Sequence, residues 1–214
     1  VTTENRSHGV VTLEQTGRKL KVLGSVMGLA PWETLHTVNF TADEVYFVTF
    51  RQVDPLFVVD LTDPAAPLLK GELEIPGYSE RLITIDESHQ LGIGRDANGA
   101  WFGELQLSLF DVSDPQAPVR THIETIAGGR TTSTEVTGNR WLAGDGDHHA
   151  LTYFAEMGIL ALPVQTENDW TAGAGLFDPG EGGLLLYRID PTEGFTFLGT
   201  IEHIDDEKGK VRVL

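Results

Sequence analysis

The chain has 214 residues, 40% of them hydrophobic, and its 15 basic and 32 acidic side chains give a formal net charge of −17. A field of that sign repels phosphate groups, which disfavours nucleic acids and anionic membrane surfaces as partners. No apolar run approaches the roughly 18 residues of a membrane-spanning helix, and the absence of cysteine excludes disulfides, thiolate metal sites and cysteine nucleophiles.

Short strands follow one another along the sequence. Residues 10–15 and 19–26 look like two outer strands of a four-stranded sheet, and residues 1–3 are a candidate remnant of another strand. Three sets of four strands follow, at 35–41, 44–50, 55–61 and 68–75, at 81–86, 90–95, 104–112 and 119–126, and at 150–155, 158–164, 183–189 and 195–204. Residues 211–214 look like the first strand of a further sheet. Valine, phenylalanine, tyrosine and threonine dominate these stretches, as pleated and partly buried surfaces favour, and we expect almost no helix.

One pattern occurs three times: an apolar strand, an Asp-Pro turn and a second apolar strand. The three Asp-Pro pairs begin at Asp63, Asp114 and Asp190, so the copies are 51 and 76 residues apart. A recurring unit of this size that is built only of strands predicts the blades of a β-propeller. Such a fold is a platform for many unrelated sites and by itself leaves the function open.

We therefore predict an all-β propeller with three complete four-stranded blades at 31–76, 77–126 and 127–205, a partial blade at 1–30 and the start of another at 206–214. Two explanations fit these unequal ends. The chain is part of a longer propeller, or its last strand joins the first ones to close a four-bladed ring. The terminal pieces supply only three obvious strands, which favours the longer propeller. A longer parent chain or an oligomer would then cover the open edges and apolar faces.

Several segments carry a resemblance to one known family. They are 46–64 (YFVTFRQVDPLFVVDLTDP), 24–26 with 28–31, 71–73 with 75–77, 91–96 (LGIGRD), 108–115 (SLFDVSDP) and 160–164 (LALPV). They resemble secreted bacterial and archaeal proteins with a C-terminal β-propeller of WD-like repeats, over about residues 20 to 204. The resemblance implies a propeller, longer proteins and a secreted or cell-envelope location. It implies no activity and no catalytic residues, and residues 136–146 and 167–182 depart from the family pattern.

Connection lengths indicate which end of the blades carries the function. Connections between first and second strands, and between third and fourth, are short. The long segments, at 24–34, 51–54, 96–103, 127–149 and 165–182, join second to third strands or one blade to the next. Insertions that gather on one face of a repeat protein build a binding surface. The predicted contacts on that face are Arg51, Asp54, Arg95, Asp96, Trp101, Arg130, Trp141, His148 and Trp170.

These residues also admit plainer interpretations. Asp54 precedes Pro55 and suits a simple turn, and the pair Arg95-Asp96 could lock neighbouring blades together rather than line a central mouth. The tryptophans, Trp32 in the 24–34 segment included, could anchor their own loops on the blades.

A metal site is the weakest of the predictions. Asp145, Asp147 and His148 lie close together, and carboxylates suit Ca²⁺ whereas histidine suits Zn²⁺ or Cu²⁺. Their spacing matches no complete site for either kind of ion. We therefore expect no cofactor, with Ca²⁺ or another divalent metal at these three residues as the remaining option.

The sequence favours a non-catalytic binding scaffold that presents its long-loop face to a protein or glycan partner. The main alternative is a hydrolase or lyase with a metal-assisted site at the central mouth, and a third is a structural spacer within a larger envelope protein. An enzyme requires a convergent polar pocket with perturbed titrating groups, whereas a binding scaffold requires a broad aromatic and polar surface.

Overall fold

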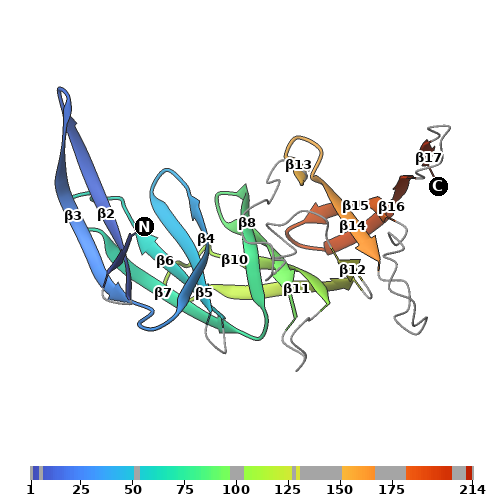
Figure 1. The fold of residues 1–214 in the computed structure, drawn as a ribbon, viewed down its shortest axis with the longest axis horizontal. Coiled ribbons are helices and arrows are strands. Elements are labelled where there is room, and N and C mark those ends of the chain that lie inside the picture. Colours follow the sequence, from blue (N-terminus) through green and yellow to red (C-terminus); the bar gives the residue numbers. More distant parts are fainter. Residues whose placement is uncertain are drawn as a thin grey trace, which may run out of the picture. The chain divides into compact units, whose positions relative to one another are not determined.

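The computed structural model describes residues 2–4, 7–50, 54–96, 104–126, 129–130, 151–166, 182–203 and 211–213. Every regular element in these ranges is a β-strand, which confirms the all-β fold class (Figure 1). Within the same ranges, no helix has the length and apolar character needed to cross a membrane. By their contacts the residues form two compact units, one of residues 1–92 with 110–120 and one of residues 93–109 with 121–214.

Four antiparallel sheets follow one another along the described chain. The first has three strands, β1 (Thr2–Glu4), β2 (Ser7–Thr16) and β3 (Lys19–Leu29). The second runs in the order β4 (Thr34–Phe40), β5 (Glu44–Phe50), β6 (Asp54–Asp60) and β7 (Leu68–Ile75). The third contains β8 (Tyr78–Asp86), β9 (His89–Arg95), β10 (Leu105–Asp111) and β11 (Val119–Ile126).

The fourth sheet holds the four strands that were predicted and two more. Its central strands are β13 (Thr152–Phe154), β14 (Ile159–Thr166), β15 (Gly182–Asp190) and β16 (Gly194–His203). The short β12 (Gly129–Arg130) also pairs with β14. β17 (Val211–Val213), expected to open a further blade, instead pairs with β16 at Ile201–His203 and so extends this sheet.

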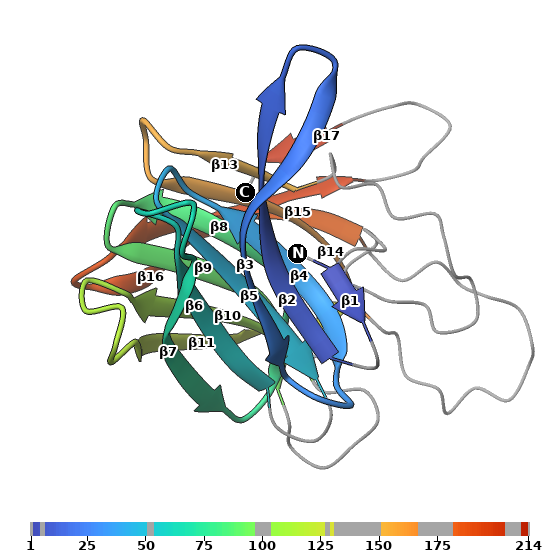
Figure 2. The same cartoon turned by 90° about the vertical axis from the view of Figure 1, so that its left-hand side faces the viewer.

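β3 is longer than the sequence indicated, because it continues through Leu29. The predicted long connection at 24–34 is therefore reduced to residues 30–33. The β2–β3 hairpin projects beyond the neighbouring sheet of β4 to β7 (Figures 1 and 2). Its strands pair up to Thr16 and Lys19, on either side of a tight turn at Gly17.

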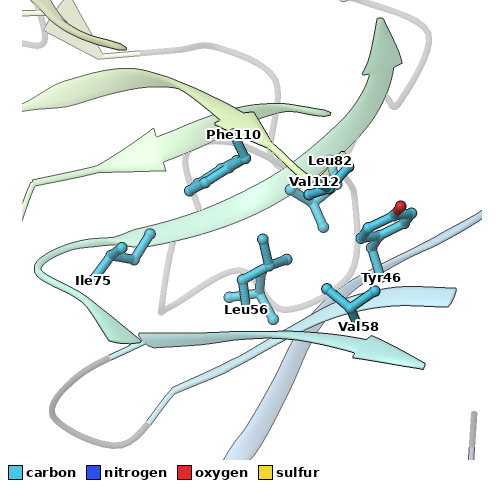
Figure 3. Packing of buried hydrophobic residues seen from close by; sticks show 8 residues of the cluster. Tyr46, Leu56, Val58, Ile75, Leu82, Phe110 and Val112 are labelled. Carbon is cyan, nitrogen blue, oxygen red and sulfur yellow. The ribbon is translucent and has the colours of Figure 1, made fainter. Parts of the chain in front are cut away.

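The second sheet is buried on both faces. One face contributes Val45, Phe47, Phe57 and Val59 to a cluster with Val10 and Leu29 of the first sheet. The other contributes Tyr46, Val48, Leu56 and Val58 to a cluster with Leu82, Phe110 and Val112 (Figure 3). Successive side chains of a strand point to opposite faces, so burial of both faces explains why these strands are continuous apolar runs.

A bulge next to a glycine recurs in β3, β7 and β16. The register shifts between Thr12 and Leu13, between Val58 and Val59, and between Leu186 and Tyr187. In each case the residue before the shift pairs with a glycine, respectively Gly24, Gly71 and Gly199. β-Bulges of this kind bend the strand and re-aim its side chains.

Two of these glycines receive the Asp-Pro turn of the following sheet. A Cβ built on Gly24 would lie 2.5 Å from the main-chain oxygen of Ala65, and one on Gly71 would lie 2.1 Å from that of Pro115. Neither position has room for a side chain, because the main chain of the turn occupies that space. We call this contact the glycine–turn interlock.

Within the second compact unit, a similar contact joins β11 to the start of β16, but here the strand β11 carries the large side chain and the glycine belongs to the other partner. His122 is the fourth residue of β11, as Gly71 is of β7. It faces Gly194, the first residue of β16, where a Cβ would lie 2.6 Å from the His122 ring. Gly194 also has φ of +85°, a conformation that suits glycine.

Candidate functional site

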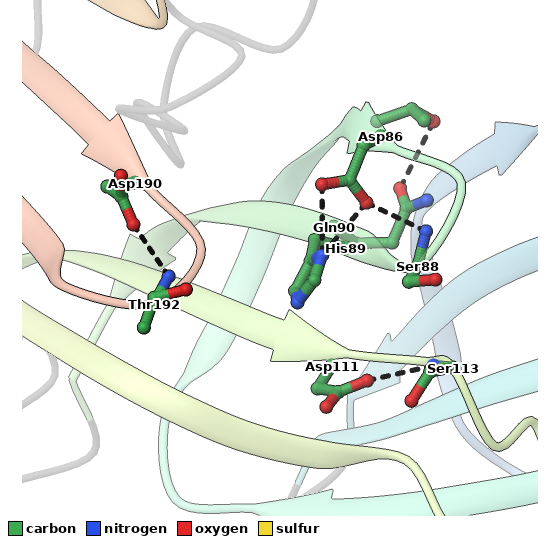
Figure 4. Close-up of polar contacts among 9 residues, drawn as sticks. Asp86, Ser88, His89, Gln90, Asp111, Ser113, Asp190 and Thr192 are labelled. Carbon is green, nitrogen blue, oxygen red and sulfur yellow. Dashed lines mark hydrogen bonds and ion pairs between the residues drawn. The ribbon is translucent and has the colours of Figure 1, made fainter.

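The turns between third and fourth strands share one hydrogen-bond pattern. Asp63 Oδ1 accepts the N–H of Ala65 at 2.9 Å, and the main-chain oxygen of Asp63 accepts the N–H of Ala66 at 2.9 Å. The equivalent carboxylate bonds are Gln116 to Asp114 at 3.0 Å and Thr192 to Asp190 at 2.8 Å (Figure 4). Asp-Pro suits this turn because the carboxylate accepts a local N–H while proline fixes φ.

A second aspartate strengthens the first two turns and is missing from the third. Asp60 Oδ1 accepts the N–H of Thr62 at 2.7 Å, and Asp111 Oδ1 accepts that of Ser113 at 2.9 Å (Figure 4). Hydrogen bonds from Thr62, with Lys70 nearby, lower the pKa of Asp60 to about 2, and hydrogen bonds from Ser113 lower the pKa of Asp111. The third turn has Arg188 at this place, and its Asp-Pro pair begins two residues later rather than three.

A shallow cleft of about 270 Å³ lies among these turns, within the first compact unit. Its lining includes Asp43, Glu44, Asp60 and Asp114, with Lys70 the cation among them. Lys70 Nζ lies 3.0 Å from Asp60 Oδ2. Two more of these carboxylates have partners, because Glu44 accepts the Tyr46 hydroxyl and Asp114 accepts a turn N–H. Asp60 and Asp114 therefore stabilise turns, whereas Glu44 binds a side chain of its own strand.

The opposite end of the sheets carries a fixed, exposed tryptophan. Between β3 and β4, Ala30 and Trp32 have positive φ values of 44° and 70°, which are uncommon for residues other than glycine. Glu33 anchors the turn, since its carboxylate accepts the Thr49 hydroxyl and its main-chain oxygen lies 3.0 Å from His8 Nε2. Trp32 remains 62% exposed. This end, which we call the connection end, corresponds to the predicted long-loop face.

A polar cluster links β4 with β8 and β9. Asn39 Nδ2 donates to Thr84 Oγ1 and to Gln90 Oε1, each at 2.8 Å. The Thr84 hydroxyl donates to the same Gln90 oxygen at 3.3 Å. Gln90 is fully buried, and its Nε2 has no hydrogen-bond partner within the described part of the chain. The cluster joins two sheets through polar contacts where the surrounding packing is apolar.

Only two of the predicted site residues have described side chains. Arg95 ends β9 and is 8% exposed, and its role as a binding contact stays a prediction. The N–H of Asp96 donates to the main-chain oxygen of Glu104 at 3.0 Å and thereby prolongs the β9–β10 pairing. Arg95 is thus largely covered, whereas Asp96 is partly exposed.

The other predicted contacts are not tested. Asp54 and Arg130 belong to β6 and β12, but their side chains lie outside the described part of the structure. Arg51, Trp101, Trp141, His148 and Trp170, and the metal candidates Asp145 and Asp147, lie outside the described residues altogether. Among the residues that are described, no group of three or more histidine or acidic side chains could hold a metal ion.

Sequence reasoning gave Trp32 no special role among the loop aromatics. Its distinguishing property is the backbone, with left-handed residues on both sides of Pro31, and no residue type in that segment signals it. The Ala-Pro-Trp sequence was visible, but a Pro-containing turn most often has ordinary φ values.

Comparisons with known proteins agree with the sheets and turns described above. The chain matches the family described as "Beta propeller domain" over residues 1–213. An uncharacterized protein of Archaeoglobus fulgidus is 37% identical over 146 residues, which are 68% of this chain and 21% of that protein. An uncharacterized protein of Methanocaldococcus jannaschii is 42% identical over 99 residues, 46% of this chain and 15% of that protein. The matched part thus spans only a minor fraction of either relative.

Proposed function

Because the chain belongs to the β-propeller domain family, we propose that it is a non-catalytic binding scaffold of an exported protein, either secreted or held in the cell envelope. It presents its connection end to a protein or glycan partner. The proposal of export rests on the resemblance to secreted propeller proteins. The binding role rests on one observation, the exposed Trp32 on its anchored turn.

Trp32 has the properties of a preformed contact. An aromatic ring offers a large apolar area with few rotatable bonds, which is why tryptophan is enriched among the residues that dominate binding energy. The turn that carries it is held by the bonds of Glu33 with Thr49 and His8, so its backbone need not be ordered again when a partner binds. Backbone conformations that cost energy are commonly retained where they serve a function.

The rival function, a hydrolase or lyase, makes a different structural demand. It requires titrating groups that converge on a cavity with perturbed pKa values. In the described ranges, the cleft lined by Asp43 and Asp60 lies at the turn end, where Asp60 and Asp114 accept turn N–H groups and Asp60 also pairs with Lys70. The geometry of the described residues supports the binding role better.

Replacing Trp32 with alanine tests the proposal. Wild type, Trp32→Ala and Phe40→Ala are compared on a glycan array and by cross-linking to an envelope-protein extract of the organism that makes the protein. Phe40 is the matched control, since it is 59% exposed and lies at the turn end of β4. We expect at least a tenfold loss of binding for Trp32→Ala alone, with unchanged thermal unfolding for both variants.

Two results contradict this proposal. One is equal binding by all three proteins, which would leave Trp32 without a role. The other is turnover of ester, glycoside or uronate model substrates by the wild type, which would establish the enzymatic alternative. The array and the extract distinguish a glycan from a protein partner.

A further inference from the structure

The end of β4 carries an acceptor pattern for N-linked glycosylation. Asn39, Phe40 and Thr41 follow the order Asn-x-Thr, in which the middle residue is not proline. In such a pattern the saccharide is attached to the asparagine amide, and the hydroxyl group of the third residue is part of what the transferring enzyme recognises. The pattern also occurs at residues 5–7, of which 5 and 6 lie outside the described residues.

The reactive nitrogen of Asn39 lies within the contact between two sheets. Nδ2 donates to Thr84 Oγ1 and to Gln90 Oε1, each at 2.8 Å. An asparagine amide has only two N–H groups, and two acceptors are in place for them. Gln90 is fully buried, and Thr84 is half-buried. Side chains of β8 and β9 therefore hold the nitrogen that a saccharide would occupy.

The hydroxyl group of Thr41 is held as well. It donates to the main-chain oxygen of Glu44 at 3.2 Å and accepts the Glu44 N–H at 3.1 Å. The N–H of Thr41 donates to the same oxygen at 3.0 Å, which closes the turn between β4 and β5. Of the three residues in the pattern, Phe40 alone is largely exposed, at 59%. Folding thus leaves the middle residue open and engages both groups that the reaction needs.

A saccharide on Nδ2 and the native contact exclude each other. The bond to the sugar replaces one of the two amide hydrogens, so Asn39 keeps a single N–H for its two partners. The sugar is also a bulky and hydrated group, and it would have to enter the contact of β4 with β8 and β9. The order of two events, folding and saccharide transfer, therefore decides which product forms.

We propose that Asn39 is an N-glycosylation site of the unfolded chain and that folding closes it. In the reaction, Asn39 Nδ2 forms a bond to the anomeric carbon of a saccharide that is carried on a lipid phosphate. The bond from that carbon to the phosphate oxygen breaks, the lipid phosphate leaves with the electron pair, and the amide loses one proton. Such patterns are modified in exported chains, so the use of this site in the cell rests on the proposed function.

One protein that carries both a covered and an open acceptor tests the proposal. Gly17→Asn with Lys19→Thr creates a further Asn-x-Thr pattern at the exposed β2–β3 turn, where a Cβ on Gly17 meets nothing within 4 Å. The full chain with these substitutions is incubated with a purified oligosaccharyltransferase and a lipid-linked saccharide, and mass spectrometry measures the occupancy of both positions. In the folded protein we expect Asn39 to reach less than about one tenth of the occupancy of position 17, because a covered site reacts only through local opening.

The same two substitutions in an unfolded background are the matched control. Phe47→Asp with Val58→Asp places a carboxylate in each of the two apolar clusters of the second sheet, where both side chains are 0% exposed. Burial of an unpaired charge is too costly for the native packing to persist, and the absence of a cooperative thermal transition in circular dichroism verifies this. Asn39 and position 17 should then be modified to similar extents.

Two results overturn the proposal. Equal occupancy of both positions in the folded protein would show that folding leaves Asn39 open. An unfolded chain that is modified at position 17 and not at Asn39 would show that Asn39 is not an acceptor. The reaction uses purified chains, so its outcome depends neither on where the protein is located nor on what Trp32 binds. Failure of the proposed function would therefore leave this result unchanged.

Discussion

Gly71 and His122 occupy the same position, the fourth residue, of β7 and β11. Gly71 contacts Pro115 and His122 contacts Gly194, so the glycine is on the strand in one contact and on its partner in the other. In the first contact, β7 has no side chain at Gly71, and atoms of the turn at 112–118 occupy that space. In the second, only residues 191–193 stay unpaired, Gly194 begins β16 directly after them, and β11 supplies the imidazole of His122. In both contacts a glycine on one side makes room for the atoms of the other side, as close-packed protein interiors require.

This difference shows that the shorter turn at 191–193 changes only the residues around it. The third turn lacks an aspartate at the place of Asp60 and Asp111, where Arg188 stands, yet the bond that ties strand to turn is kept. The N–H of Ile189 donates to the Gly158 oxygen at 2.7 Å, as that of Leu61 donates to the Asp43 oxygen at 2.7 Å. The second unit therefore keeps the main-chain frame of the repeat and changes the side chains that fill it.

The largest effect is expected from Gly71→Val. Its side chain would have to enter space that the Pro115 oxygen occupies at 2.1 Å from the Cβ position. Because that atom is main chain, the neighbouring sheet must shift, and we expect a loss of about 3 kcal/mol in the free energy of unfolding. Urea denaturation measures it.

Glu74→Val in the same strand is the control for Gly71→Val. Glu74 is exposed, so its replacement should change the free energy of unfolding by less than about 0.5 kcal/mol. If both valine variants lose the same free energy of unfolding, the glycine–turn interlock adds no stability beyond that of an exposed β7 position.

A smaller effect is expected where the turn carries the glycine. Gly194→Ala adds a methyl group 2.6 Å from the His122 ring at a φ of +85°, and should cost about 2 kcal/mol. His122→Ala removes most of the clash but leaves the backbone strain. The double variant should therefore recover about 1 kcal/mol relative to the sum of the single variants. Strict additivity in urea denaturation would show that only backbone strain matters at this turn.

Much of the fold was predictable because the strands are buried on both faces. Long apolar runs of β-branched and aromatic residues mark β5 and β6, and β7 lies at the predicted residues 68–75. Pairing was harder to predict. β12 is too short to show a period, and the sequence of β17 does not reveal which edge it joins.

The glycine–turn interlock could not be predicted from the sequence, because its common feature, a glycine after a bulge, is seen only in the strand register. Gly24, Gly71 and Gly199 each follow a bulge, but a lone glycine in a strand has many possible roles. The candidate site was less predictable than the fold. Arg95, predicted as a binding contact, is 8% exposed, and the sequence alone does not show which way a residue near a strand end faces. Trp32 is presented by backbone torsions that no residue type specifies.

The smallest effect should come from the aspartate that the third turn lacks. The Thr62 hydrogen bonds and Lys70 lower the pKa of Asp60 to about 2 from an ordinary 3.8. A lowered pKa means that the charged form stabilises the fold above about pH 4, and that this contribution is lost as the pH falls from about 4 toward 2. In the Asp60→Asn variant, the new amide oxygen still accepts the Thr62 N–H but the side chain carries no charge. We expect the wild type to exceed this variant in stability by under about 1 kcal/mol at pH 6, since the pair with Lys70 is partly exposed. Urea denaturation at a series of pH values should show this stability difference vanishing by pH 2. A difference that does not change with pH would mean that Asp60 stabilises the turn through its geometry and not through its charge. The third turn forms without an aspartate at this place.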